Sequence, residues 1–316
     1  MSNRFIVLII IFAGLITACT TDVTIDIPIQ SDVLVVEGII ENELPPYILL
    51  TKSVAIFGGN SLNDLEDLYV HNAIVTVESE GQLVTLPEIC ITDLPIPIQQ
   101  QVAANLGFNF NDSTEIPNIC IYTDPNYFLT GNATLLGEEE RDYHLTIQAE
   151  GKTLTATTRV PKVIGYNFLS YENHPNPNND SMLVVTCNLT IPDTFGNHVR
   201  YFTKRNNEPL YPPLSSSVWD DKLFIGTTIE LPIERGQNPQ DDLDFATYSF
   251  FWKGDTVVLK WCDISKPHFD FWRTLESDGG DSPFSTPVIK KSNIVGDGVG
   301  VWGGYAATYD TIILPL

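Results

Sequence analysis

The sequence predicts an all-β fold of two packed β-sandwich-like domains, the first immunoglobulin-like and the second carrying one short helix. Apolar and polar residues alternate with a period of two in several segments, which is the pattern of half-buried strands. Glu-Gly pairs stand between alternating segments, where a tight hairpin turn needs residues that tolerate positive φ. About seven such strands precede Val160-Pro161, a density typical of a β-sandwich. We therefore expect domains over residues 32–162 and 163–316.

The first domain shows its strand pattern most clearly near its end. In Tyr143–Ala149 the odd positions are apolar and the even positions polar, Glu150-Gly151 follows as a turn, and Thr153–Thr157 returns with threonines on one face. That pattern predicts a β-hairpin. The other strands expected in this domain are Val33–Ile40, Tyr47–Ser53, and a second hairpin of Ile74–Val77 and Leu83-Val84 joined by Glu80-Gly81.

The second domain combines strands with polar loops. Five apolar residues at alternate positions share one face of an expected strand: Leu183, Val185, Cys187, Leu189 and Ile191. Further strands are expected over Phe224–Ile233, Thr247–Trp252, Thr256–Trp261 and Ala306–Leu314. The runs Asn173–Asp180 and Gln237–Asp244 are rich in turn-forming residues and predict exposed loops.

One helix is expected, over residues 266–276. Ser265 is a suitable N-cap, and Pro267 fits the first turn, where its missing N–H breaks no helical hydrogen bond. An apolar residue recurs every three positions, at Phe269, Trp272 and Leu275, and predicts the buried stripe of this helix.

The N-terminus has the pattern of a bacterial lipoprotein signal. Arg4 is the only charge before Asp22, and an uninterrupted apolar run covers Phe5–Ile16. Such a run is too short for a transmembrane helix, which needs about 20 apolar residues, but it fits the apolar core of a signal peptide. Ile16-Thr17-Ala18-Cys19 resembles a lipobox, in which the cysteine receives diacylglycerol and becomes the first mature residue. We expect a signal peptide over residues 1–18, lipid on Cys19 and a linker over 19–31; the alternative is an ordinary signal peptide with a chance cysteine.

Composition and charge restrict the compartment and the partners. The chain has 40 Asp+Glu and 17 Lys+Arg, a formal net charge of −23, which becomes −24 when the signal peptide takes Arg4 with it. A surface this acidic repels the phosphate backbone of nucleic acids, and nucleic acid is therefore excluded as a partner. Thr20 rather than Asp follows Cys19, which by resemblance to bacterial sorting rules favours the outer membrane. Because an anionic membrane does not attract so acidic a body, we expect its N-terminal lipid to hold it there. We also expect the body to face the cell surface.

Four cysteines follow the lipobox, an even number that permits disulfides in an exported protein. Cys90 and Cys120 flank the polar segment Leu94–Asn118, and a bridge between them would close a loop of roughly 30 residues, worth about 3–4 kcal/mol. Cys187 and Cys262 lie in separate apolar patterns and form either a second bridge or two small buried hydrophobes. No metal site or cofactor is expected, since no CxxC occurs and the five histidines are scattered.

Gly296–Gly304 is the segment that most resembles a functional motif. It fails as a phosphate loop, because a strand rather than a helix is expected after it. Glycines in β structure more often mark a bulge or a close approach of backbone. The alternative is a partner or ligand surface formed by Trp302 and Tyr305. No nucleophile elbow and no HExxH motif occur, so no catalytic residue is predicted.

Two further groups of residues favour structural roles. Asp241, Asp242 and Asp244 lack the spacing of an EF-hand and indicate an acidic surface loop rather than a calcium site. The aromatic groups Phe250-Phe251-Trp252 and Phe269–Trp272 are expected in the core of the second domain, with an exposed stacking platform as the alternative.

Several blocks of the sequence together resemble one known family. The lipobox is followed by Leu34–Ile40, Tyr143–Ile147 and Thr155–Pro161, and the C-terminal part supplies Asp270–Leu275, Pro283–Pro287 and Ser292–Ile294 with Gly298–Tyr305. These blocks are similar to outer-membrane lipoproteins of the Bacteroidota whose domain has no assigned function and which are often encoded beside TonB-dependent receptors. The resemblance spans nearly the whole mature chain; it implies this location and a β-barrel receptor as partner, and it implies no catalytic residue. The cysteine-bounded segment is longer here than the family leads one to expect.

The residues and the resemblance together predict a non-enzymatic outer-membrane lipoprotein, an accessory or ligand-binding subunit of a TonB-dependent transporter. Two alternatives stay open. One is a surface hydrolase of glycans or peptides, whose carboxylates cannot be singled out among 40 acids. The other is a structural adhesin or a component of envelope assembly. The ligand itself is not readable from the sequence.

Overall fold

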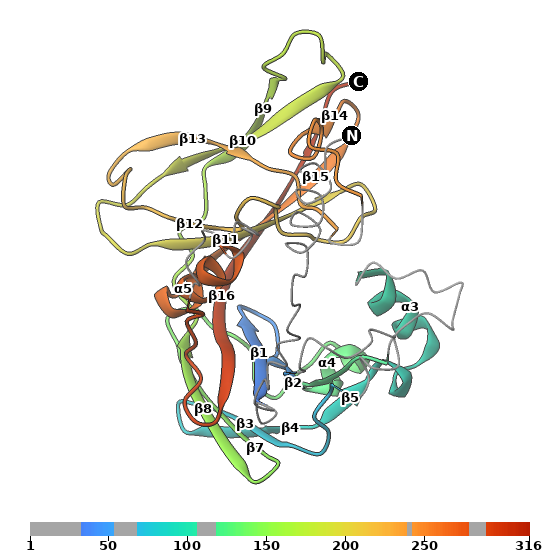
Figure 1. Cartoon of the computed structure of the whole chain (residues 1–316), viewed down its shortest axis with the longest axis vertical. Coiled ribbons are helices and arrows are strands. Elements are labelled where there is room, and N and C mark those ends of the chain that lie inside the picture. The colour runs from blue at the N-terminus through green and yellow to red at the C-terminus, as the bar shows by residue number, and fades with distance from the viewer. Residues whose placement is uncertain (1–32, 54–67, 106–117, 239–241, 278–288) are drawn as a thin grey trace, which may run out of the picture. The chain divides into compact units, whose positions relative to one another are not determined.

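The computed structural model describes residues 33–53, 68–105, 118–238, 242–277 and 289–316 (Figure 1). Residues Asp32–Leu316 belong to one compact unit. The expected signal peptide, the lipidated Cys19 and the linker lie outside the described residues. Within the described ranges, no helix has the length and apolar character needed to cross a membrane.

The fold is all-β, as predicted, and its largest sheet has eight strands in the order β12-β11-β15-β16-β1-β2-β6-β5. In the middle of this sheet β16 pairs in parallel with β1 and antiparallel with β15. The sheet therefore joins strands from both ends of the described chain. Its members are β1 (Leu34–Glu41), β2 (Tyr47–Lys52), β5 (Glu88–Cys90), β6 (Cys120–Tyr122), β11 (His198–Arg205), β12 (Val218–Asp220), β15 (Thr256–Ile264) and β16 (Gly298–Ile313).

A four-stranded sheet in the order β4-β3-β7-β8 contains both predicted hairpins. Glu80 and Glu150, the first residues of the two Glu-Gly turns, have φ of 50° and 51°, the left-handed conformation that such turns require. The strands are β3 (Ile74–Ser79), β4 (Gln82–Leu86), β7 (Asp142–Ala149) and β8 (Lys152–Arg159).

A second four-stranded sheet forms around β10, which pairs with β9, β13 and β14. The five apolar residues predicted to share one face of β10 and its end are all buried, from 0% to 5% exposed, which confirms the alternation. The strands are β9 (Phe168–Asn173), β10 (Met182–Thr190), β13 (Thr228–Ile233) and β14 (Phe251–Trp252).

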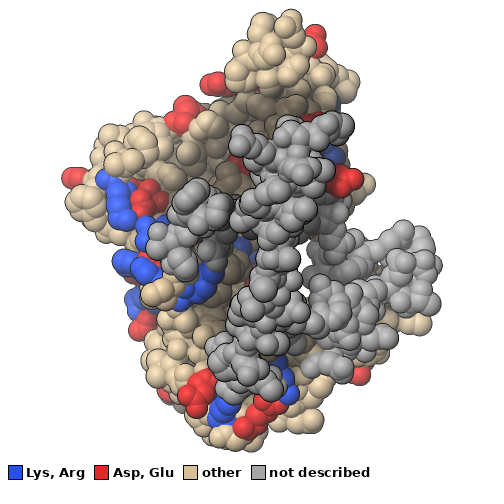
Figure 2. All heavy atoms as spheres, viewed as in Figure 1, with Lys and Arg blue, Asp and Glu red and all other residues tan. Residues whose placement is uncertain are grey.

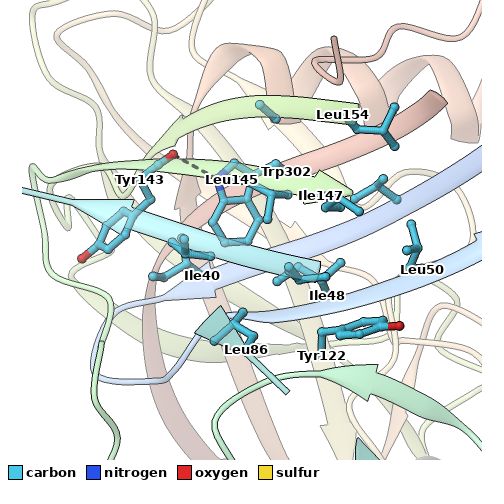
Figure 3. Close-up of a cluster of buried hydrophobic side chains, with 14 of the residues drawn as sticks. Ile40, Ile48, Leu50, Leu86, Tyr122, Tyr143, Leu145, Ile147, Leu154 and Trp302 are labelled. Carbon is cyan, nitrogen blue, oxygen red and sulfur yellow. Dashed lines mark hydrogen bonds between the residues drawn. The ribbon is translucent and has the colours of Figure 1, made fainter. Parts of the chain in front are cut away.

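The first hydrophobic core lies between the eight-stranded sheet and the sheet of the two hairpins. Alternate residues of β1 point into it, so that Leu34 and Val36 are fully buried. Trp302 of β16 is buried in the same core, and its Nε1 donates a hydrogen bond to the carbonyl oxygen of Tyr143 at 3.0 Å. Figure 3 shows this indole among the large side chains of the core: Ile40, Ile48, Leu50, Leu86, Tyr122, Tyr143, Leu145, Ile147 and Leu154.

The second hydrophobic core joins β11 and β15 to the sheet around β10, with Trp261 and Phe251 fully buried in it. The domain boundary expected between residues 162 and 163 does not separate the two cores, because residues from both sides of it pack together in the first core. Trp302 and Ala306, from the segment 163–316, complete the first core, which residues 32–162 otherwise form. The chain thus builds two sandwiches that share one sheet in place of two separate domains.

Helix α5 (Lys266–Glu276) confirms the helix expected over residues 266–276, with Ser265 as its N-cap residue. Its buried side differs from the prediction. Phe269 is buried as expected, but Leu275 is 42% exposed and His268 is fully buried instead. A strict spacing of three residues drifts around a helix of 3.6 residues per turn, so the third member of the predicted stripe turns away from the sheet.

Two further helices correct the expectation of a single one. Helix α3 (Ile96–Asn105) lies within Leu94–Asn118, which was expected to be an irregular insertion, and follows the short 3₁₀ turn η1 (Ile91–Asp93). The segment after Pro97 is rich in Gln and Ala and contains no helix breaker, so it has good helix propensity. Helix α4 (Pro125–Thr130) begins after Asp124, whose carboxylate accepts a hydrogen bond from the backbone N–H of Asn126.

Candidate functional site

Trp302 and Tyr305, the sequence-based candidates for a partner or ligand surface, are buried, at 0% and 2% exposed. Strand β16 runs through the middle of the eight-stranded sheet, so that both of its faces are covered. Trp302 lies in the first core, and Tyr305 lies on the opposite face in a cluster with residues of α5. These two residues do not form a surface, and the prediction is corrected on this point.

The glycines beside them have the structural role that was expected. Gly300 has a φ of 127°, and a Cβ at this position would overlap the backbone of Val36 on the neighbouring strand, 2.8 Å from its carbonyl carbon. Glycine is required there because β1 and β16 approach closely. The glycine-rich run therefore allows these two strands to pack closely.

The face of the eight-stranded sheet opposite the two cores gathers charged and aromatic side chains. Successive residues of a strand point to opposite faces, so residues that alternate with the buried apolar ones reach this side. Helix α5 packs on part of it through Phe269 and Trp272. We call this surface the charged face; it carries Glu37, Glu41, Arg200, Lys260, Tyr305 and Tyr309.

A lysine and a glutamate form the centre of the charged face. The ammonium group of Lys260 and the carboxylate of Glu41 form an ion pair whose side chains are only 14% and 8% exposed. The hydroxyl of Tyr309 donates a hydrogen bond to Glu41 at 2.7 Å. Burial opposes the charge of Lys260, but its interactions with Cys262, Glu41 and Tyr309 raise the pKa of the amine, so it stays protonated. The rings of Tyr305 and Tyr309, 5.7 Å and 5.4 Å away, add cation–π contacts.

Arg200 is a second buried cation on this face, 5% exposed. Its Nη1 donates to the hydroxyl of Tyr305 at 2.8 Å, and its Nε donates to Oγ of Ser217 at 3.0 Å. The guanidinium carbon stands 3.4 Å from the ring centroid of Trp272, and this stacking contributes to holding the charge below α5. The two hydrogen bonds and the stacking on Trp272 together fix the orientation of this guanidinium group.

His268 of α5 completes the buried part of the site. Its ring lies 4.6 Å from that of Tyr305, centroid to centroid, and stacks on it. A Cβ on Gly303 would overlap this ring, so the glycine creates the space that the imidazole fills. Burial, together with the positive charge of Arg200, lowers the pKa of His268 to about 3. The imidazole is therefore neutral throughout the physiological range.

The edge of the charged face is open to solvent. Tyr309 is 53% and Tyr47 is 39% exposed, and Glu37 is half-buried. Tyr47 stands opposite Ile39, two residues from Glu37 on the same side of the sheet. Burial raises the pKa of Glu37, and the charge of Arg200 offsets part of that effect. Aromatic rings beside a carboxylate and fixed cations are suited to hold a ligand that has both planar and charged groups.

Helix α5 and the later segment that contains Lys291 form a basic patch on this strongly acidic protein. Lys266, Arg273 and Lys291, all at least 46% exposed, surround the carboxylate of Asp270. Burial opposes ionisation of Asp270, but hydrogen bonds from Lys266 and Lys291 lower its pKa, so one negative charge faces three positive ones. Figure 2 shows Lys and Arg gathered in this region of the surface. The surplus of positive charge is local and favours an acidic group on a partner.

The cysteines separate into one bridge and two thiols. The disulfide expected between Cys90 and Cys120 is present and joins β5 to β6. The second bridge is not: Cys187 and Cys262 are free thiols, each fully buried in a different cluster. Burial raises the pKa of both thiols to about 12, which leaves them unreactive. Of the two alternatives, the one in which Cys187 and Cys262 are small buried hydrophobic residues is confirmed.

Beside the disulfide lie a histidine and a glutamate. His71 Nδ1 and a carboxylate oxygen of Glu88 form a short ion pair or hydrogen bond, and one ligand atom from each of His71, Glu88, Cys90 and Cys120 lies within 4.8 Å of the others. The sequence did not predict this meeting, because His71 is 17 residues from Glu88 and no ligand spacing marks the pair.

The acidic loop near residue 242 contains a hydrogen-bonded turn. The carboxylate of Asp244 accepts from the backbone N–H of Ala246 at 3.0 Å and from the hydroxyl of Thr247 at 2.9 Å, and these bonds lower its pKa. Asp241 lies outside the described residues. Asp244 thus has a local structural role.

Charged residues within apolar strand segments are the one sequence feature that points to the charged face, and the strand patterns alone did not single them out. Glu37, Lys260 and Arg200 each stand within an otherwise apolar strand segment. A lone charge at such a position is expensive to bury without partners, so it indicates a second, polar face of a sheet. Which charges meet across the sheet depends on strand order, which no local pattern shows.

Comparison with known proteins completes the description of the chain. No curated protein matches it in sequence. A family model described as "Domain of unknown function (DUF4249)" matches residues 20–311, which covers nearly everything after the lipobox. The chain therefore belongs to the DUF4249 family of domains of unknown function.

Proposed function

We propose that this protein is a non-enzymatic lipoprotein of the outer membrane that serves as an accessory or ligand-binding subunit of a TonB-dependent transporter. The lipobox Ile16–Cys19, directly after the apolar run Phe5–Ile16, is the observation that carries the proposal. Two acyl chains on Cys19 give stable anchoring, which one chain alone does not. The anchored protein then faces the cell surface, where it meets a β-barrel receptor in the same membrane.

Family membership and block resemblance support the choice of partner. The family model covers residues 20–311, and the sequence blocks named above resemble outer-membrane lipoproteins of the Bacteroidota that are often encoded beside TonB-dependent receptors. Without the signal peptide and its Arg4 the acidic body has a net charge of −24, so it needs a lipid rather than surface charge to stay at an anionic membrane.

The charged face supports binding as the activity of this subunit. Its buried ions are held by partners two strands away in the same sheet, Lys260 of β15 by Glu41 of β1 and Arg200 of β11 by Tyr305 of β16. Near neutral pH Lys260 keeps its proton, and His268 is neutral and fully buried, so neither group is suited to exchange protons with a bound molecule. The exposed rings of Tyr47 and Tyr309 supply contact area next to the fixed charges.

Lipidation is tested by metabolic labelling with a radioactive fatty acid. Wild type should incorporate the label and Cys19→Ala should not, while Cys187→Ala, which removes a buried thiol, should be labelled as wild type is. Equal incorporation into wild type and Cys19→Ala would refute the anchor.

The partner is tested by purification from native outer membranes in mild detergent. A tag after Leu316, which is fully exposed, leaves the N-terminal lipid untouched. We expect one β-barrel receptor to co-purify with the protein. Recovery as a free monomer would contradict the accessory role, and turnover of a glycan or peptide library by the pure protein would contradict the non-enzymatic one. Tyr47→Ala with Tyr309→Ala, compared with Tyr171→Ala on β9, then shows whether the charged face makes the contact.

A further inference from the structure

Four metal-ligating side chains meet at the edge of the eight-stranded sheet. His71 comes from the turn before β3, Glu88 and Cys90 from the terminal strand β5, and Cys120 from β6. We call this group the edge cluster. One ligand atom from each member lies within 4.8 Å of the others. In a tetrahedral zinc site, with bonds of 2.0–2.3 Å, ligand atoms are about 3.3–3.8 Å apart. The two sulfurs, which are bonded to each other in the disulfide, would separate to about this distance after reduction, while the other ligand atoms already lie within 4.8 Å of them.

Hydrogen bonds to Tyr122 of β6 and to Glu88 of β5 hold the turn that carries His71 in place. The hydroxyl of Tyr122, a buried residue of β6, donates to the carbonyl oxygen of Val70 at 2.6 Å and accepts from the N–H of Ala73 at 3.0 Å. Asn72 has a φ of 58°, and its N–H donates to the second carboxylate oxygen of Glu88 at 3.1 Å. These bonds fix the turn against β5 and β6, so the histidine is already positioned.

Strand register brings the other ligands together. Cys90 stands directly opposite Cys120, with Cα atoms 4.0 Å apart. Glu88 is two residues before Cys90 and therefore points to the same side of β5. The side chains of His71 and Glu88 are 49% and 20% exposed, so an ion can reach the cluster from solvent.

We propose that the edge cluster is a redox-controlled zinc site: the chain with reduced cysteines binds one Zn²⁺ through these four side chains, and the disulfide and the metal exclude each other. Two thiolates, an imidazole and a carboxylate are ligands typical of Zn²⁺, whereas Ca²⁺ and Mg²⁺ prefer oxygen alone. Zinc also accepts the tetrahedral arrangement that two adjacent strands and one turn can supply.

The exchange balances with a dithiol as reductant. A thiolate of the dithiol attacks one sulfur of the Cys90–Cys120 bond, the S–S bond breaks, and the dithiol leaves as a cyclic disulfide, so that two electrons pass to the cysteines. The two resulting thiols lose their protons as Zn²⁺ binds, and two protons are released. Either crosslink, disulfide or metal, closes the same segment between residues 90 and 120, 30 residues apart in sequence.

The test uses the full chain in mild detergent, oxidised or reduced by a phosphine that is removed under nitrogen. Co²⁺ serves as the spectroscopic probe and Zn²⁺ as its competitor. The reduced chain should bind one equivalent of Co²⁺ with the visible bands of a tetrahedral, thiolate-ligated ion, and Zn²⁺ should displace it; the oxidised chain should show neither. Zn²⁺ should also protect Cys90 and Cys120 of the reduced chain from alkylation, read residue by residue by mass spectrometry.

Two histidine variants decide whether the edge cluster is responsible. His71→Ala should weaken Zn²⁺ binding at least as much as the ~10- to 100-fold that loss of an outer-shell partner costs. His174→Ala, at a histidine outside the cluster whose Nδ1 contacts the backbone of Asn176, should bind as wild type does. Equal binding by His71→Ala and wild type would overturn the proposal. So would binding by the oxidised chain, absence of binding by the reduced chain, or loss of its β-type circular dichroism on reduction.

Discussion

The packing of His268 against Gly303 predicts that a larger residue at position 303 lowers the stability of the protein. In Gly303→Ala the new Cβ would stand 2.8 Å from Cγ of His268 and would overlap two further ring atoms. Ordinary contact begins at 3.4 Å, so the ring has to move by roughly 0.6 Å at Cγ and further at its other atoms. His268 is fully buried and is stacked on Tyr305 at 4.6 Å, which leaves the ring no direction in which to move freely.

The expected cost follows from overpacking. Forcing an extra carbon into a packed core costs about 1–3 kcal/mol, although alanine in a strand is intrinsically better than glycine. In the His268→Ala background the methyl group enters the space that the ring has left, so Gly303→Ala should cost less than about 1 kcal/mol there. The difference between the two backgrounds is a coupling free energy of about 1–3 kcal/mol.

Urea unfolding followed by tryptophan fluorescence measures all four proteins of this cycle. The midpoint should fall for Gly303→Ala without a change in slope, which identifies a change in stability rather than in the unfolded state. Leu83→Ala, at a side chain that is 66% exposed on β4, serves as a control and should leave the midpoint nearly unchanged. An equal cost of Gly303→Ala with and without His268 would refute the packing argument.

Three further perturbations test other parts of the structure. Cys90→Ala with Cys120→Ala should lower the free energy of unfolding by about 3–4 kcal/mol, measured by urea unfolding without reductant, and no loss would deny the bridge a stabilising role. Burial raises the pKa of Asp263 from 3.8 to about 6, although two backbone N–H groups bind its carboxylate. This carboxyl group therefore contributes stability below pH 3.8 that is lost as the pH rises through about 6. The free energy of unfolding of Asp263→Asn should accordingly rise by up to about 3 kcal/mol relative to that of wild type between pH 4 and pH 7.5. Parallel profiles of unfolding free energy against pH would contradict this. Lys260→Met should cost about 3–5 kcal/mol of stability because it leaves the carboxylate of Glu41 buried without its cation. In thermal unfolding, Lys260→Met combined with Glu41→Leu should recover most of that loss. A double variant no more stable than the single one would count against the ion pair.

Local patterns were sufficient for much of the fold. The hairpins around Glu80-Gly81 and Glu150-Gly151 depend on side-chain alternation and on turn residues that tolerate positive φ, both of which are properties of a few adjacent residues. The helix at residues 266–276 was predictable from the first-turn proline and from the first two members of the apolar stripe, although the side chain of Ser265 makes no cap hydrogen bond. The bridge between Cys90 and Cys120 was predictable because both cysteines flank one polar segment.

The errors have a common physical origin. Trp302 and Tyr305 looked like surface aromatics beside a glycine-rich run, but the burial of a strand depends on what covers its two faces, and β16 is covered on both. The helix α3 was missed because polar helix formers resemble a polar loop when no apolar stripe marks a packed face. Cys187 and Cys262 stayed apart because they belong to different sheets: Cys187 of β10 lies in the second core, whereas Cys262 of β15 points to the opposite face of the eight-stranded sheet, under α5.

The sequence by itself determined the elements of this protein and the signal for its address: an apolar run that ends in a lipobox, short alternating strands and a strongly acidic composition. Only the tertiary structure decided that the last strand pairs in parallel with the first, that two sandwiches share one sheet, and that Arg200, Lys260 and Glu41 meet on its far face. The reason is the range of the interactions. Turns, caps and alternation act over a few residues, whereas the Lys260–Glu41 pair joins positions 219 residues apart and exists only once β15, β16 and β1 lie in register.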